Sequence, residues 1–510
     1  MTDLKSETAP LQGLPLVIAI MTIAAANFMS FLDMTIANVA LPPIAGGLGV
    51  TPHEGVWTIT SYAVAEAIAV PLTGWVVGRY GSVRVFIAAS FAFGLFSLVC
   101  GLSTTLAMLV AGRILQGLAG GFLVPVSQVL LQTVVPPKHA SLGVTVWGLT
   151  ALTAPVFGPL LGGLFCDTWG WQWCFFINVP VAAICVIVAM SILPKDRGAT
   201  ARSRMDYVGL GLLVLWVGAF QITLDTGEQN DWFNSFGIIL LIATALAGLA
   251  VFVIWELTDD APIVDLRVFR HRGFTVATIV MFVAFACIAA YNVVFVLWLQ
   301  MAIGYPAIWT GYAMTYISLL PAVVAPLIGF LMTRVDSRLL ISGGLFVMGG
   351  TFLCRVGYAS NMPFEGLAFM QAMTGMSGTF YFVPIMGMAV AMVDREEMAS
   401  AAGLFNFART LSMAFGSAVG IALWTRIAAM KHADLAGMLN APDTMLAGAP
   451  RLGVTMEQAR GLIESGVQTE ALMLATNQMF LLMGLATCAS SILIWLAPKP
   501  AGQLEMAPAH

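Results

Sequence analysis

The amino-acid sequence predicts an all-α integral membrane protein with fourteen transmembrane helices. Of its 510 residues, 59% are hydrophobic and only 9% are charged. Soluble globular proteins carry about 25% charged residues, so this composition excludes that class. The chain also contains fourteen apolar runs, each long enough to cross a bilayer as a helix.

The runs follow one another with no room for a soluble domain between them. We expect the first run to remain as a span, because it is longer than the apolar core of a signal peptide. The long connection before the last run, residues 426–470, is rich in Ala and Gly, and its Ala-rich stretches predict short amphipathic helices. The predicted spans are 14–40, 56–77, 83–102, 105–134, 140–165, 172–193, 206–225, 236–257, 273–300, 307–332, 338–359, 363–391, 398–425 and 471–497.

Positive charges predict which way the helices cross the membrane. With a cytoplasmic N-terminus, the inward connections and termini hold 15 Lys and Arg residues, whereas the six short outward connections hold none. Positive residues are enriched in cytoplasmic connections, and long segments such as residues 426–470 do not count toward this rule. Both termini are therefore expected in the cytoplasm. The fifteen are Lys5, Arg79, Arg84, Lys138, Lys195, Arg197, Arg202, Arg204, Arg267, Arg270, Arg272, Arg334, Arg338, Arg395 and Lys499.

Two of the connections resemble each other, which predicts two related halves. The segments GWVVGRYGSVR (Gly74–Arg84) and GFLMTRVDSR (Gly329–Arg338) begin 255 residues apart. We expect a six-helix half at residues 1–205, an inserted helical hairpin at 206–260 and a second six-helix half at 261–510, which includes the long connection. Duplicated halves with a substrate site between them near the midplane are a common transporter plan.

The first run contains one acid, Asp33, in the stretch LDMTIANVALP. A helix that begins at Leu14 places this carboxylate about 28 Å along its axis, in the outer half of the membrane. An acid at this depth costs about 2.5–3.5 kcal/mol on insertion scales, so it is retained where it faces a cavity or a partner. Asp33 is therefore a candidate proton-coupling residue. The alternative is an acid at the outer interface that is held by water.

Two further charges inside predicted helices are candidate partners. Arg113, in RILQGLAGG, lies about 12 Å from the outer end of the fourth helix. Glu66 lies near mid-depth of the second helix. An intramembrane arginine needs a counter-charge or backbone carbonyls, and Asp33 and Glu66 are the candidates for the counter-charge. Both residues are proton-coupling candidates; the alternatives are a fixed structural ion pair for Arg113, and for Glu66 a neutral buried carboxyl group or a cavity acid for cationic ligands.

The fifth predicted helix carries APVFGPLLGG (Ala154–Gly163). Proline removes a helical hydrogen-bond donor, and glycine lets helices approach more closely than any side chain allows. This combination predicts a helix that bends and packs tightly, as a gate requires, although ordinary small-residue packing gives the same pattern. The candidate gate residues are Pro155, Gly158, Pro159, Gly162 and Gly163.

Other polar residues inside predicted helices are candidates for the wall of a substrate cavity, while Arg355 is expected to anchor the outer half structurally. The chain contains no GxxxxGK[ST], HExxH or CxxC motif, so we expect no ATPase, metal or cofactor site and no enzyme activity. Only Cys166 and Cys174 flank the same outward connection and are a possible disulfide pair. The cavity candidates are Asn38, Gln116, Tyr291, Asn292, Asn406 and Arg409.

Taken together, LDMTIANVALP, GRYGSVR, RILQGLAGG, APVFGPLLGG and WGWQWCFFINVP resemble the fourteen-helix drug:proton antiporters of the major facilitator superfamily. LDTGEQNDWF (Leu224–Phe233) and VIWELTDDAPIVDLRVFR (Val253–Arg270) resemble the EmrB-like multidrug efflux pumps within it. The resemblance runs nearly end to end. It implies the major facilitator fold and proton-coupled export of hydrophobic or amphipathic drugs across a bacterial inner membrane by alternating access.

The resemblance also implies roles for residues. Asp33 matches the first-helix acid of proton or substrate coupling, and Arg113 matches the fourth-helix arginine linked to proton transfer. The glycines of the fifth helix and Pro159 match the antiporter motif. Gly78 stands where the family's inner loop usually has an acid, and Gln172 where the outer face usually has an arginine. The loop motif that controls the inward gate corresponds to Gly74, Arg79, Gly81 and Arg84.

The resemblance further implies partners for the outward face. It predicts that residues 426–470 dock a periplasmic membrane-fusion adaptor that leads to an outer-membrane channel; the alternative is a plain linker. Two other functions remain open from the residues. One is a carrier of the same fold for one dedicated metabolite, and the other is a membrane sensor or scaffold that transports nothing.

Overall fold

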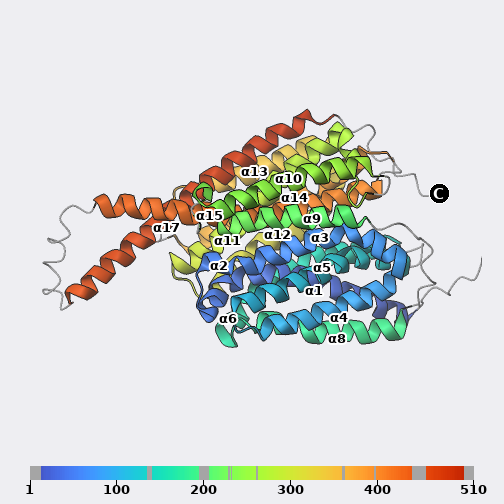
Figure 1. Ribbon diagram of the computed structural model, residues 1–510, viewed down its shortest axis with the longest axis horizontal. Coiled ribbons are helices and arrows are strands. Elements are labelled where there is room, and N and C mark those ends of the chain that lie inside the picture. The colour runs from blue at the N-terminus through green and yellow to red at the C-terminus, as the bar shows by residue number, and fades with distance from the viewer. Residues whose placement is uncertain are drawn as a thin grey trace, which may run out of the picture.

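The computed structural model describes residues 13–134, 140–193, 206–227, 230, 232–259, 262–332, 334–358, 362–394, 398–438 and 455–498. All regular structure within these ranges is helical. The long helices lie side by side in one bundle, and two of them project well beyond one end of it (Figure 1). The expected all-α fold is confirmed.

The first six predicted spans are all helices. The short helices α2 and α7 each continue a longer helix, so that α2 with α3 and α7 with α8 form one span apiece. The elements are α1 (Leu14–Leu48), α2 (Pro52–Gly55), α3 (Trp57–Tyr80), α4 (Ser82–Gly101), α5 (Leu106–Val134), α6 (Ala140–Thr168), α7 (Trp173–Phe176) and α8 (Asn178–Ile192).

The remaining eight predicted spans are helices as well. Three short 3-10 turns accompany them, η2 (Trp232–Asn234), η3 (Leu266–Arg270) and η5 (Ile494–Leu496). The long elements are α9 (Tyr207–Thr226), α10 (Phe236–Thr258), α11 (Arg272–Met301), α12 (Ala307–Met332), α13 (Ser337–Cys354), α14 (Phe364–Ala391), α15 (Met398–Met438) and α17 (Met456–Leu493).

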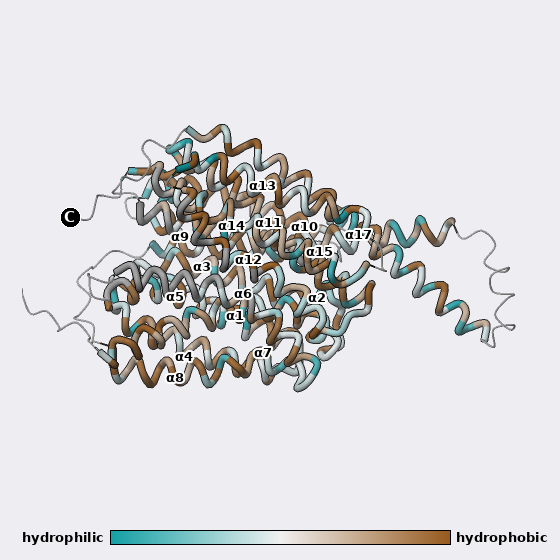
Figure 2. The backbone as a smooth tube through the Cα atoms, turned by 180° about the vertical axis from the view of Figure 1, so that it is seen from behind, coloured by the Kyte–Doolittle hydropathy of each residue, from teal (hydrophilic) through white to brown (hydrophobic). Residues whose placement is uncertain are grey.

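The surface of the bundle suits lipid. In the part of the chain that the structure describes, eleven helical segments are long and apolar enough to cross a membrane, and α6, α12 and α14 bring the number of long segments to the predicted fourteen. The apolar colour covers most of the bundle (Figure 2). Ile184 and Ile187 on α8 and Ile254 on α10 are 60–64% exposed, which is unfavourable in water but suits contact with acyl chains.

The long connection at residues 426–470 is helical over most of its described part, as its Ala-rich stretches predict, but the helices are extensions of two membrane spans and not separate short helices. Residues 426–438 continue α15 and residues 456–470 begin α17, and these two arms project from the bundle and diverge (Figures 1 and 2). We call the end with the arms the outer end and the opposite end the inner end. The 41 residues of α15 make a helix about 60 Å long, twice the thickness of a bilayer core. Strong helix formers such as Ala, Met and Lys allow it to continue past the apolar span.

The packing separates the chain into an early and a late group of helices (Figure 1). One buried apolar cluster joins residues of α1, α3, α4, α5 and α8, and a larger one is built mainly from α11 to α17. Helix α9 adds Leu213, Trp216 and Val217 to the larger cluster. It also stacks Phe220 on Phe415 of α15, with ring centroids 5.9 Å apart. The division at residues 205 and 260 stays a prediction.

Candidate functional site

Asp33 and Arg113 form a buried ion pair between α1 and α5. Arg113 Nη1 lies 2.5 Å from Asp33 Oδ2, and the two side chains are 1% and 0% exposed, respectively. Two opposite charges compensate each other in an apolar bundle, where either one alone would be very costly. The structure therefore selects Asp33, rather than Glu66, as the counter-charge in contact with Arg113.

The guanidinium of Arg113 also ties α5 to α3. Its Nε donates to the Thr58 carbonyl at 2.8 Å, and Nη1 donates to Gln116 Oε1 at 2.9 Å. The ring of Tyr62 lies against the guanidinium, 4.2 Å from Cζ to the ring centroid. The planar fork is thus satisfied in several directions, which an ammonium group cannot reproduce.

The second carboxylate oxygen of Asp33 is held by two amides. Asn178 Nδ2 donates to Oδ1 at 2.7 Å and Gln116 Nε2 donates to it at 2.9 Å. Both amides also contact Ser97 Oγ, which itself donates to the Phe175 carbonyl at 2.8 Å. We call Asp33, Ser97, Arg113, Gln116 and Asn178 the Asp33 network. It joins α1, α4, α5 and α8, and none of its members is more than 1% exposed.

Two members of the network, Ser97 and Asn178, were not predicted from the sequence. Asn178 begins α8 within FFINVP, and an asparagine at the start of an apolar run was the available signal. Ser97 offered none, because a lone serine in a membrane helix usually bonds its own backbone.

Glu66 lies on α3 and faces the later helices. It is 5% exposed, and its Oε2 has no hydrogen-bond partner in the described chain. Its charge interacts electrostatically with that of Arg409 on α15. Arg409 donates only weakly, to Met413 Sδ at 3.7 Å, and its guanidinium lies over Phe285. Two charges of opposite sign, one on an early and one on a late helix, thus attract each other without an ion pair or hydrogen bond between them in the described chain.

The other cavity candidates fall into two groups. Asn38, Asn292 and Asn406 are half-buried, and Asn292 Oδ1 is buried without a hydrogen-bond partner in the described chain. Gln116 belongs to the Asp33 network, and Tyr291 is fully buried. These two side chains therefore make fixed contacts inside the protein.

Tyr291 belongs to a polar cluster around Arg355, in the later helices. Its hydroxyl donates to Gln371 at 2.5 Å, and Arg355 donates to Thr374 at 3.0 Å and to Gln371 at 3.4 Å. Gln371 follows Gln116 by 255 residues, and Arg355 follows Cys100, which contacts Gln116, by the same number. This spacing equals that of the two similar connections, as expected if the two halves are related, a division that stays a prediction.

The glycines of α6 lie where its neighbours approach most closely. A methyl group at Gly158 would collide with Thr35 of α1, and one at Gly163 would lie 2.5 Å from the Ala307 carbonyl oxygen of α12. Asp167, at the outer end of α6, accepts a hydrogen bond from the Ile308 amide at 2.7 Å. Helix α6 therefore links α1 to the later helices near the outer end.

The remaining candidate gate residues of α6 are one glycine and two prolines. Gly162 packs against Ile36, so that a methyl carbon added there would lie 3.0 Å from the Ile36 carbonyl oxygen, and Pro159 is buried. The backbone remains one helix over Ala140–Thr168. The side chain of Pro155 lies outside the described part of the chain.

The inner loop motif forms a tight turn between α3 and α4. Gly81 has a φ of 89°, a conformation that favours glycine, and it is the single residue between the two helices. Arg79 is exposed and lies over Trp75, 5.5 Å from its ring centroid. Gly74 and Arg84 are exposed on the flanking helices.

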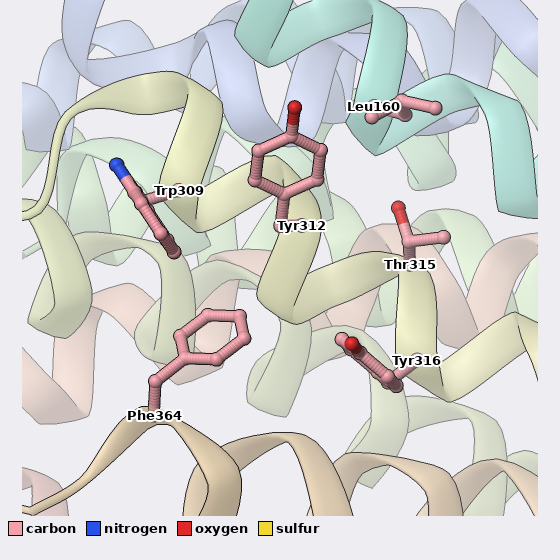
Figure 3. A pocket seen from close by; sticks show the side chains of 6 residues that line it. All are labelled: Leu160, Trp309, Tyr312, Thr315, Tyr316 and Phe364. Carbon is pink, nitrogen blue, oxygen red and sulfur yellow. The ribbon is translucent and has the colours of Figure 1, made fainter.

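A cavity of about 400 Å³ opens elsewhere, on the outer part of α12 (Figure 3). Its wall is aromatic and contains none of the predicted cavity residues. Trp309, Tyr312 and Tyr316 are 36–49% exposed, so this cavity is open at the surface of the bundle. Its lining residues are Leu160, Trp309, Tyr312, Thr315, Tyr316 and Phe364.

The cysteines and acids offer no metal site in the described chain. The sulfur atoms of Cys166 and Cys174 lie 3.8 Å apart, and both residues are free thiols. A disulfide requires about 2.05 Å. The two cysteines are in contact and unbonded.

The sequence is similar to bacterial export and resistance proteins over nearly its whole length. It is 36% identical to Multidrug export protein EmrB of Escherichia coli K12 over 498 residues, 97% of both chains. It is also 36% identical to Fatty acid resistance protein FarB of Neisseria gonorrhoeae, over 96% of this chain and 98% of that one.

Solved structures share the fold at low identity. A peptide transporter of the POT family aligns over 93% of this chain and 94% of its own with a TM-score of 0.62 and 15% identity. A bacterial homologue of the lysosomal transporter Spinster aligns over 96% and 97%, with a TM-score of 0.62 and 13% identity. Residues 23–417 match the sequence profile of the Major Facilitator Superfamily. The chain thus belongs to the Major Facilitator Superfamily and, within it, to the EmrB-like multidrug export proteins.

Proposed function

We propose that this transporter exports hydrophobic and amphipathic small molecules in exchange for protons. The names of its relatives, multidrug export and fatty acid resistance proteins, support this substrate class. One observation supports proton coupling, namely the fully buried Asp33 carboxylate, which accepts hydrogen bonds from Arg113, Gln116 and Asn178.

Protonation of Asp33 would change the contacts of α1. A neutral carboxyl group no longer compensates Arg113, so the link between α1 and α5 weakens. Thr35, two residues further along α1, touches α6 at Gly158, and α6 touches α12 at Gly163. A shift of α1 is therefore transmitted to the contact between early and late helices, as alternating access requires.

We further propose the setting in which this exchange takes place. The similarity to bacterial export and resistance proteins supports an inner membrane location, and the distribution of Lys and Arg supports placing both termini in the cytoplasm. The transmembrane proton gradient is the proposed energy source, with no cofactor. The two arms at the outer end are the proposed contact for a periplasmic membrane-fusion adaptor and, through it, an outer-membrane channel.

Replacing Asp33 by Asn tests the coupling. The variant keeps the size of the side chain but holds no exchangeable charge, so we expect drug efflux driven by a pH gradient in proteoliposomes to fall at least about tenfold, or 1.4 kcal/mol. Folding is expected to persist, as checked by the yield of purified protein and its unfolding temperature. Glu365→Gln, an exposed acid, serves as the control. Normal gradient-driven efflux by Asp33→Asn would refute the proposal.

A further inference from the structure

The inner ends of α9 and α10 are joined by two carboxylates that the export cycle does not use. Asp206 caps α9 by accepting a hydrogen bond from the Gly209 amide at 2.7 Å, and both its oxygens lie 3.0 Å from Trp255 Nε1. Glu256 is fully buried, and its Oε2 accepts from the Val264 amide at 3.0 Å. Its other oxygen, Oε1, has no hydrogen-bond partner in the described chain.

The unpartnered oxygen faces the other carboxylate. A methyl group placed on Gly209 would collide with both Asp206 Oδ2 and Glu256 Oε1, so the two oxygens lie within 2.5 Å of the same point. Asp206 is 8% exposed. Two carboxylates in such a space repel each other when both are ionised, and one shared proton removes the repulsion.

Among the residues that the structure describes, neither Asp206 nor Glu256 forms an ion pair with a basic side chain. The charged residues that follow Glu256 in the described chain begin with Asp259, Asp265 and Arg267. Arg267 donates to the carbonyls of Leu257 and Asp259, at 3.4 and 2.9 Å, and Asp265 accepts from the Arg267 amide. Asp259 adds a third negative charge near Glu256.

The hairpin that this pair closes touches the helices of the candidate site. Helix α9 packs on both α3 and α15, which carry Glu66 and Arg409. Trp216 of α9 is buried against Phe252 of α10, so the two hairpin helices pack on each other through aromatic rings. A change in the protonation of Asp206 and Glu256 is therefore expected to change how tightly α9 packs against α3 and α15.

We propose that Asp206 and Glu256 share one proton taken from the compartment at the inner end, and that this proton fastens the hairpin. The proton sits on Glu256 Oε1 and its O–H donates to Asp206 Oδ2, which leaves a single negative charge on the pair. As the pH rises, the proton is released to water and both carboxylates are ionised. Their repulsion then destabilises the contact between the start of α9 and the end of α10. The hairpin ends are thus tight at low pH and loose at high pH, independently of the direction of transport.

Hydrogen exchange of the purified protein in nanodiscs tests this proposal. Protection of the backbone amides at 207–212 and 263–268, corrected for the intrinsic exchange rate, is measured from about pH 6 to about pH 8.5. We expect protection in the wild type to fall roughly tenfold across this range. In Glu256→Gln, the amide donates to Asp206 in place of the shared proton, so protection stays high and independent of pH.

A second test variant and a control variant complete the experiment. Asp206→Asn retains acceptors for Gly209 and Trp255 and donates to Glu256, so it must also lose the pH dependence. Asp394→Asn, a 70% exposed acid, must keep the wild-type profile. The proposal is overturned by a flat wild-type profile, by an unchanged pH dependence in either amide variant, or by protection that follows sodium or potassium concentration at constant pH.

Discussion

At the scale of single residues, Arg113 makes more hydrogen bonds than an ion pair with Asp33 alone would need. It contacts the Asp33 carboxylate, the Thr58 carbonyl and the Gln116 amide, which belong to three of the early helices. A residue that only neutralised Asp33 would not need this geometry. The arrangement is suited to an exchange of partners when Asp33 is protonated.

Replacing Arg113 by Lys separates charge from geometry. Lysine keeps the positive charge but cannot reach Asp33 and the Thr58 carbonyl together, so we expect gradient-driven efflux to fall at least about tenfold. The amount of folded protein should change much less than in Arg113→Ala, which leaves Asp33 buried and uncompensated at a cost of about 3–5 kcal/mol. Nearly normal efflux by Arg113→Lys would identify the pair as purely structural. Efflux in proteoliposomes and yield after purification measure the two effects.

Glu66 and Arg409 are expected to act as a pair across the two groups of helices. We predict that Glu66→Gln lowers the efflux of cationic drugs more than that of neutral drugs, because it removes the buried negative charge. Combined with Arg409→Gln, its effect should be non-additive by about 0.5–3 kcal/mol, as calculated from transport rates. Strictly additive effects would show that the two charges work independently.

At the scale of elements, α6 packs between α1, which carries Asp33, and α12 of the later helices. Glycines of α6 lie at both contacts. Gly163 contacts the backbone of α12, which cannot rotate away as a side chain can. Helix α12 is fixed there also by the bond from the Ile308 amide to Asp167. Near the outer end, α6 and α12 therefore meet through backbone contacts that a single methyl group is able to disturb.

Gly163→Ala is expected to weaken the contact between α6 and α12. The added carbon overpacks the contact, which typically costs about 1–3 kcal/mol, so the unfolding temperature should fall and α6 and α12 should separate. Pulsed electron resonance between spin labels at Thr168 and Tyr312, both exposed, would report a longer distance. Gly74→Ala is the matched control, because nothing lies within 4 Å of an added carbon there. An unchanged distance and stability in Gly163→Ala would contradict the role of this contact.

At the scale of the whole molecule, the arms are rigid continuations of membrane helices. His432 Nε2 and Glu464 Oε1 lie 2.9 Å apart and join the two arms near the bundle. Buried packing ends close to this point, at Ala428 on α15 and at Ala471 on α17. The arms beyond it contribute little to the core, which suits a surface for another protein.

Replacing residues 431–466 by a short Gly/Ser linker tests that surface. We expect gradient-driven efflux in proteoliposomes to stay within about twofold of the wild type, since the buried core is untouched. In cells, drug resistance and co-purification of the adaptor should both be lost. A linker variant that retains full resistance and captures the adaptor normally would place the docking surface elsewhere.

The number and placement of the membrane helices followed from the sequence alone, as did the burial of Asp33, Glu66 and Arg113 within them. These are local properties, because a bilayer demands long apolar helices and penalises every charge inside one. The extent of the arms did not follow, since residues 426–438 and 456–470 lack the apolar character by which spans are recognised.

Only the tertiary structure decided which groups meet. Asn178 reaches Asp33 from 145 positions away, Ser97 joins the same network, and Arg113 selects Asp33 over Glu66. Likewise, Glu256 faces Asp206 because two antiparallel helices end side by side at Gly209. Such contacts depend on the depth and rotation of separate helices, which the periodicity of one helix does not specify.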